Sequence, residues 1–195
     1  MARLRALLWC CLILCASRAG ASTHCAAVTV EVDLPAPMAW ELLSDFSLAH
    51  NYVPDLTATE IMSSQRQGVG AHRRVYQSGG DYLEETITQW YPGSGFVIRL
   101  HKAEQPMAPF ERALFTYRLD EVASERTLVT LSLQVDMPWG IVGDWLGEWV
   151  ITPLLRKNLV QIAAGMKYFY ETGQPATDND RERLAPLVQI PPGGC

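Results

Sequence analysis

The chain has 195 residues, of which 48% are hydrophobic and 19% charged, a composition typical of one folded globular domain. Its formal net charge is −5, with 21 acidic residues against 16 lysines and arginines. This acidic balance argues against a nucleic-acid backbone as the main partner, because binding to phosphates needs an excess of positive charge. It argues equally against an anionic membrane surface as the main partner, although a transient membrane contact stays open. The sequence sets no oligomeric state.

The N-terminus has the pattern of a secretory signal peptide. Two arginines precede the apolar run 6–16, and a small-residue motif follows that ends at Ala21. The run has about half of the ~20 residues that a membrane-spanning helix needs. We therefore expect residues 1–21 to be removed and the mature protein to be exported, either to a periplasm or out of the cell. The alternative is an uncleaved N-terminal anchor.

The cysteines support an exported protein. Removing residues 1–21 takes away three of the five cysteines and three arginines but no acid, so the net charge changes from −5 to −8. Cys25 and Cys195 remain, one near each end of the mature chain. Because free thiols rarely persist in an oxidising compartment, we expect a Cys25–Cys195 disulfide. The alternative is two unpaired thiols on loose ends.

The first part of the mature chain predicts a strand followed by short helices. Residues 26–34 alternate apolar and polar side chains, which is the period of a half-buried strand. A short amphipathic helix is predicted over 36–45, and a second helical turn over 48–53. Further strands, separated by turns rich in glycine and proline, are predicted at 56–64, 70–77, 81–91, 96–102, 110–119 and 126–135. Successive hairpins at this spacing favour an antiparallel meander.

The last part of the chain predicts a long helix over 139–172. Pro153 cannot donate a backbone hydrogen bond, so either the helix kinks there or Thr152 caps a new helix. Beyond it, apolar residues recur at steps of four and three, which predicts one buried stripe: Leu155, Leu159, Ile162, Met166 and Phe169. Gly173 is suited to end the helix. Residues 174–195 are rich in proline, glycine and charge and predict an extended tail, in which a short turn near Arg181–Leu187 stays open.

This order of elements is that of the helix-grip fold, and three segments strengthen the likeness. VEVDLPAPMAWELLSDF (30–46), GVGAHRRV (68–75) and EETITQWYP (84–92) resemble motifs of the START / polyketide-cyclase superfamily (SRPBCC). The residues that match are Trp40, Leu43, Asp45, Gly68, Gly70, Arg73 or Arg74, Glu85, Ile87, Trp90 and Pro92. The terminal segment from Trp145 to Glu171 is similar to the last helix of the superfamily. An export signal and a cysteine-containing tail are departures from the pattern.

The resemblance implies an α+β helix-grip domain over 26–173, with a curved antiparallel sheet of six or seven strands wrapped around the long C-terminal helix. It also implies an apolar cavity between sheet and helix that holds a lipid, quinone, sterol or polyketide-like molecule. The candidate lining residues are Trp90, Tyr117, Trp145, Trp149, Leu155, Leu159, Ile162, Met166 and Phe169. For each of them the alternative is ordinary core packing.

The polar residues of the predicted meander are the candidates for chemistry. His72 and Arg74 share one face of their strand, and Arg73 shares the other face with Val75. An Arg74–Glu85 contact is the candidate buried pair, because a buried charge needs a partner. Such a pair could anchor a ligand or position an acid/base carboxyl. The alternative is a solvent-facing salt bridge of little energetic value.

No specific catalytic or metal motif is present. The chain lacks a nucleophile elbow, a P-loop, a HExxH motif and a dinucleotide fingerprint. The sequence spacing of the four histidines suggests no metal site, and no cofactor is expected. The residues that an enzyme would use are Arg74, Glu85, His101 and Tyr117.

Three functions remain open at this point. The favoured one is an exported binding protein for an apolar small molecule. The first alternative is a polyketide cyclase or dehydratase that uses polar residues of the cavity as acid and base. The second is a protein-contact module that uses the tail 174–195.

Overall fold

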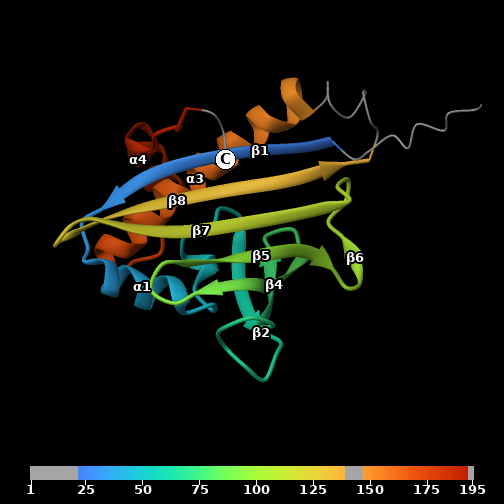
Figure 1. Ribbon diagram of the computed structural model, residues 1–195, viewed down its shortest axis with the longest axis horizontal. Coiled ribbons are helices and arrows are strands. Elements are labelled where there is room, and N and C mark those ends of the chain that lie inside the picture. The colour runs from blue at the N-terminus through green and yellow to red at the C-terminus, as the bar shows by residue number, and fades with distance from the viewer. Residues whose placement is uncertain (1–21, 139–146, 193–195) are drawn as a thin grey trace, which may run out of the picture.

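One antiparallel sheet packs against a long helix in the computed structural model of the protein, which describes residues 22–138 and 147–192 (Figure 1). The strands are β1 (Ser22–Val32), β2 (Leu56–Ile61), β3 (His72–Gln77), β4 (Tyr82–Tyr91), β5 (Gly95–Lys102), β6 (Gln105–Pro106), β7 (Arg112–Ala123) and β8 (Arg126–Met137). The helical segments are α1 (Ala36–Ser44), η1 (Ala49–Asn51), η2 (Gly147–Ile151), α3 (Thr152–Thr172), α4 (Asp178–Leu184) and η3 (Ala185–Leu187).

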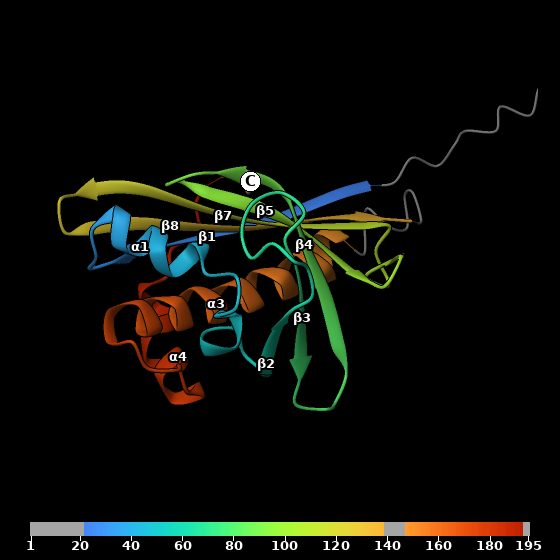
Figure 2. The same cartoon turned by 90° about the horizontal axis from the view of Figure 1, so that it is seen from below.

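The strands follow the order β1-β8-β7-β5-β4-β3-β2, and β6 pairs with β5 beside this path. Figure 2 shows α3 and α4 on the same side of the sheet, with β2, β3 and β4 bending down beside α3. This arrangement confirms the helix-grip fold. The sheet has eight strands where the sequence predicts six or seven, because β6 has two residues and so no periodicity to recognise.

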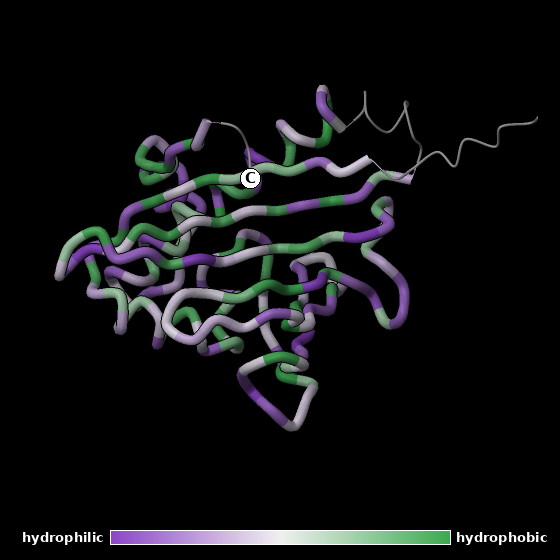
Figure 3. The backbone as a smooth tube through the Cα atoms, viewed as in Figure 1, coloured by the Kyte–Doolittle hydropathy of each residue, from purple (hydrophilic) through white to green (hydrophobic). Residues whose placement is uncertain are grey.

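Alternation along the strands places the core on the face that meets α3. In β8 every second residue is buried, from Thr127 to Met137, while the residues between them are partly exposed. Figure 3 shows the same change between hydrophilic and hydrophobic residues along the long strands. The two-residue period of a strand therefore creates one apolar face for the helix to cover.

Helix α3 begins at Thr152, directly after the π-helical turn η2. Pro153 lies in the first turn of α3. Ile151 already has right-handed helical dihedral angles, so η2 continues directly into α3. Thr152 does not cap the helix through its side chain, so of the two predicted alternatives the cap is wrong. Gly173 ends the helix as predicted, with a left-handed φ of 71° and its N–H bonded to the Phe169 carbonyl at 2.8 Å. Among the described residues, no helix is long and apolar enough to cross a membrane.

The structure differs from the expected extended tail after Gly173, because residues 178–184 form α4, whereas the turn η3 (Ala185–Leu187) falls within the stretch where the sequence left a short turn open. Thr177 and Asp180 form a capping box that starts α4. Arg181 on α4 is only 6% exposed, and its Nη1 donates to Asp178 Oδ1 at 2.9 Å. Further along, the backbone of Gln189 pairs with that of Thr29 on β1. The seven residues of α4 are too few for a helical period to show in the sequence, and its docking depends on a buried arginine rather than on an apolar stripe.

Candidate functional site: the cavity between sheet and helix

A cavity of about 290 Å³ lies between the inner face of the sheet and α3. The inner face is defined here as the face that meets α3, and the outer face as the opposite one. The apolar part of the lining includes Val75, Leu100, Phe115 and Leu133 from the sheet and Leu155 and Ile162 from α3. The polar residues of the lining are Asp55, Gln77, Glu85, Tyr117 and Asn158. The cavity is therefore apolar over most of its wall and carries a few groups able to form hydrogen bonds.

The predicted apolar stripe of α3 is confirmed as buried, but only part of it reaches the cavity. Leu155 and Ile162 line the cavity. Leu159, Met166 and Phe169 are buried in the surrounding core instead, with at most 7% of each residue exposed. For these three, the alternative of ordinary packing is correct.

Of the predicted aromatic lining residues, the structure places one at the cavity. Tyr117 lines the cavity, whereas Trp90 is half-buried and packs against Trp40 at 4.9 Å and Phe96 at 5.5 Å between ring centroids. Trp149 is 69% exposed, so its assignment to the lining is wrong. It lies on the π-helical turn η2, six positions before Leu155, and alternating steps of three and four from Leu155 do not reach it, so it is not part of the stripe. Trp145 lies outside the described residues.

A buried ion pair lies at the cavity wall. It joins Glu85 to Arg73, whereas the sequence predicted Arg74 as the partner. The register of β3 and β4 pairs Arg73 with Glu85, so the expected Arg74–Glu85 contact is wrong. A shift of one residue moves a side chain to the other face of a sheet. Arg73 Nη2 and Nε each lie 2.5 Å from Glu85 Oε2. The sequence did contain a sign that Arg73 is the buried arginine, because Arg73 shares a strand face with the apolar Val75.

Other inner-face groups complete the surroundings of Arg73. Its Nη1 donates to the Phe46 carbonyl at 2.7 Å, and its guanidinium lies 3.9 Å from the centroid of the Phe46 ring. Burial is the largest single effect and would lower the pKa of Arg73, but the charge of Glu85, the hydrogen bond to it and the nearby Tyr52 and Tyr117 together raise it. Arg73 is therefore a permanent cation, 1% exposed, whose charge is balanced by Glu85.

Two tyrosines join this network. The phenol of Tyr52 lies close enough to Arg73 and Tyr117 for both to affect its pKa. Burial, as the largest cause, raises the pKa of Tyr52 and raises that of Tyr117 well above its usual value. Tyr117 therefore stays protonated and can act as a hydrogen-bond donor at the cavity wall. The sequence analysis did not identify Tyr52 as a site residue. It lies at the end of the three-residue helical turn η1, which is too short to show a hydrophobic period.

The other two candidates for chemistry lie on the outer face. Arg74 Nη2 donates to Glu84 Oε1 at 2.7 Å, and this hydrogen bond is the main reason that the pKa of Glu84 is lowered. His101 is buried among Glu84, Thr86 and the backbone of the following turn. Neither Arg74 nor His101 reaches the cavity, because each alternates along its strand with a residue of the inner face. Of the four candidates, Glu85 and Tyr117 remain at the cavity.

The chemistry and shape of this cavity agree with a match to a known family. The family model described as polyketide cyclase / dehydrase and lipid transport matches residues 23–167. The chain belongs to this family. A search of curated protein sequences finds no match.

Solved structures similar to this member of the polyketide cyclase / dehydrase and lipid transport family share its fold. An aromatase/cyclase named Zhui from a Streptomyces species has a TM-score of 0.59 at 18% identity, over 76% of this chain and 94% of its own. A START superfamily protein from Mycobacterium smegmatis has a TM-score of 0.56 at 17% identity, over 74% and 95%. A major latex-like protein from Panax ginseng has a TM-score of 0.56 at 15% identity, over 76% and 97%. At these identities the likeness shows the fold alone.

Proposed function

We propose that the protein is exported and binds an apolar small molecule in the cavity between the sheet and α3. The observation that supports this proposal is a partly open space between sheet and helix with a mainly apolar wall and a few polar groups, which is the usual composition of a small-molecule site. Its volume of about 290 Å³ is at the low end of the range for such sites. Among a lipid, a quinone, a sterol and a polyketide-like molecule, the size favours a compact quinone or polyketide-like ring system.

Export is supported by one feature of the described chain. Cys25 is disulfide-bonded, and structural disulfides are typical of oxidising compartments. The predicted signal peptide and the predicted partner Cys195 both lie outside the described residues, so they stay predictions. An intact mass that corresponds to residues 22–195 would support the processing.

An enzyme of the cyclase or dehydratase type is the second candidate. It is favoured by the presence of a carboxylate, Glu85, and a protonated phenol, Tyr117, on the wall of one apolar cavity. In that case Tyr117 would donate a hydrogen bond or a proton to a carbonyl oxygen of the substrate. Glu85 is less available as a base, because it balances the charge of Arg73.

Native mass spectrometry, followed by solvent extraction, is the first test of binding. The protein is purified from the compartment to which it is exported, and we expect an apolar molecule to travel with it in a one-to-one ratio. An adduct-free protein that also fails to bind an added naphthoquinone or a fluorescent fatty acid would overturn the proposal.

A pair of matched variants tests whether the ligand binds in the cavity. Leu155→Trp fills the cavity from α3, whereas Leu154→Trp introduces the same side chain at the neighbouring, 60% exposed position. We expect the first variant to lose binding of the added probe and the second to keep it. Equal loss in both variants, with both folded by circular dichroism, would place the site elsewhere.

Tyr117→Phe separates binding from chemistry. It keeps the ring and removes the hydroxyl, so a binding protein keeps its affinity within about tenfold. A cyclase that relies on this proton loses roughly 10²-fold or more in turnover.

A further inference from the structure

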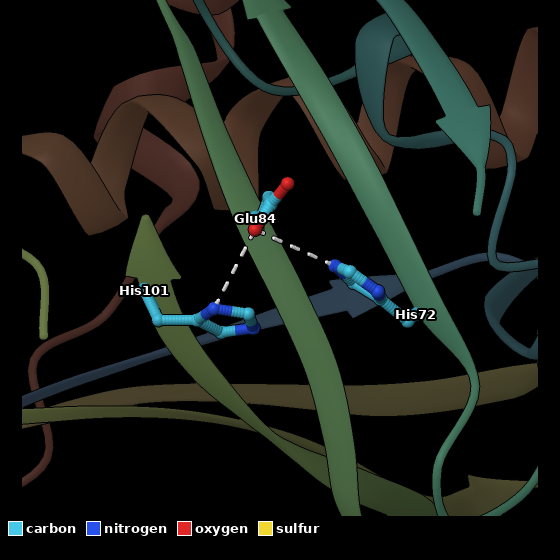
Figure 4. A group of neighbouring side chains, drawn as sticks. All are labelled: His72, Glu84 and His101. Atoms are coloured by element: carbon cyan, nitrogen blue, oxygen red, sulfur yellow. Dashed lines mark ion pairs between the residues drawn. The ribbon is translucent and has the colours of Figure 1, made fainter. Parts of the chain in front are cut away.

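A cluster of three metal-ligating side chains lies on the outer face of the sheet, opposite the cavity. His72 comes from β3, Glu84 from β4 and His101 from β5, three strands that are neighbours in the sheet. One potential ligand atom from each residue lies within 4.8 Å of the other two. In Figure 4, the Glu84 carboxylate lies between the two imidazole rings. Its Oε2 is 3.8 Å from His72 Nε2 and 3.8 Å from His101 Nδ1.

The nitrogen of His72 that faces Glu84 is buried without a partner. Within the described part of the chain, no hydrogen bond satisfies His72 Nε2, although that atom is shielded from solvent. Leaving a buried polar atom unpaired costs about 1–3 kcal/mol, and an unseen water or ion is a usual explanation. The rest of the cluster is equally enclosed, since Glu84 and His101 are each 5% exposed. A ligand bound between the three residues would give Nε2 the partner that it lacks.

We propose that His72, Glu84 and His101 bind one divalent transition-metal ion of the zinc class. Two imidazoles and one carboxylate are a donor set that such ions accept. With zinc–ligand bonds of about 2.0–2.2 Å, tetrahedral ligand atoms lie roughly 3.3–3.5 Å apart. The separations of 3.8 Å between Glu84 and each histidine exceed this range by a few tenths of an ångström. All three ligand atoms lie within 4.8 Å of one another, so the two histidine nitrogens must approach each other by up to about 1.4 Å, which rotation of the partly exposed His72 side chain would provide. A water molecule would complete the coordination.

Metal binding requires a change of tautomer at His101. Its Nδ1 lies 2.7 Å from the Ala103 carbonyl, which can only accept, so without a metal Nδ1 carries the proton. When the metal binds, the proton moves to Nε2, which can donate it to Thr86 Oγ1 at 2.8 Å, and Nδ1 exchanges the carbonyl for the ion. Glu84 Oε1 accepts from Arg74 at 2.7 Å, and Oε2 accepts from the Ala103 N–H at 2.9 Å. Within the described residues Oε2 accepts only this one hydrogen bond, so it has a further lone pair with which it can bind the ion.

The ion would act on the sheet rather than on the ligand of the cavity. Its three ligands connect neighbouring strands, and inner-face residues separate it from the cavity. The site is thus independent of the proposed binding function, and either proposal can fail without the other.

Calorimetric titration with Zn²⁺ alone tests the site. The full exported chain, without an affinity tag and after removal of metals with a chelator, is expected to bind one Zn²⁺ and to melt at a higher temperature when loaded. Co²⁺ is expected to give the intense visible absorption of a tetrahedral site. Absence of saturable binding by the wild-type protein would overturn the proposal.

Three variants test the ligands. His72→Gln, at a partly exposed position, is expected to weaken Zn²⁺ binding more than tenfold. Thr86→Val, which removes the hydrogen bond to His101, is expected to weaken it by roughly tenfold. His24→Gln on β1 is the matched control and is expected to change nothing. Equal affinities for wild type, His72→Gln and Thr86→Val would assign the bound ion to another place on the protein.

Discussion

Replacing Glu85 by Gln removes the counter-charge of a buried arginine while the size and shape of the side chain stay almost the same. Arg73 is 1% exposed and cannot reach water without unpacking the inner face. After the change its guanidinium keeps the Phe46 carbonyl, the Phe46 ring and the Tyr52 phenol as neighbours, none of which carries a negative charge.

Removing one partner of a buried ion pair typically lowers the free energy of unfolding by about 3–5 kcal/mol. Gln retains an oxygen that can accept one hydrogen bond from Arg73, so we expect the lower end of that range. Domains of this kind have a free energy of unfolding of about 5–15 kcal/mol, so the variant is expected to fold but to be much less stable.

Urea denaturation followed by circular dichroism measures this loss as a lower midpoint at an unchanged slope. The control is Asp120→Asn, which breaks the exposed Arg118–Asp120 pair in the same sheet and is expected to cost at most about 1 kcal/mol. The combined Arg73→Met and Glu85→Leu variant is expected to be more stable than Glu85→Gln, because no charge is then left buried. A loss for Glu85→Gln no larger than that of the control would refute this reasoning.

Three further predictions concern stability. Gly165→Ala would place a Cβ atom 2.2 Å from the Tyr52 carbonyl oxygen, so a net loss of about 1–3 kcal/mol is expected in the same denaturation assay despite the better helix propensity of alanine; an unchanged or raised stability would contradict the close packing of α3. Tyr170→Phe removes a buried hydroxyl that has no hydrogen-bond partner in the described chain, so a gain of about 1 kcal/mol is expected, and a loss of that size would reveal a hidden partner. Burial raises the pKa values of Tyr52, Tyr117 and Tyr170, so the folded chain holds these protons where the unfolded chain, with pKa values near 10, releases them. Stability is therefore expected to fall as the pH rises above about 10, and phenolate absorbance should show these three of the seven tyrosines ionising only on unfolding; early ionisation of all seven would contradict their burial.

The sequence alone was sufficient for features that depend on local periodicity. The two-residue alternation located the long strands, and the steps of four and three located the buried stripe of α3 from Leu155 to Phe169. Gly173 marked the end of that helix, since it can adopt a left-handed conformation without steric cost. These local patterns, taken in order, also carried the resemblance to the family. They succeed because burial on one side of an element repeats with the geometry of that element.

The polar site depends on contacts between strands, and there the sequence was insufficient. The residues on each face of β3 were assigned correctly, but the pairing of β3 with β4 differs by one residue from the expected Arg74–Glu85 contact. That single step decides that Arg73 lies beside the cavity and Arg74 on the outer face. No local pattern reports it, because register is set by the hairpin turn and by packing on α3.

Only the tertiary structure brings distant residues into one place. Arg181 reaches the carbonyl of Tyr52 because α4 folds back onto α3. The seven-residue, charged sequence of α4 contains no pattern that predicts this docking. His72, Glu84 and His101 have no regular spacing along the chain, and they meet because three strands lie side by side about 5 Å apart. Periodicity thus determines which side of an element is buried, whereas register and docking determine which polar groups meet there.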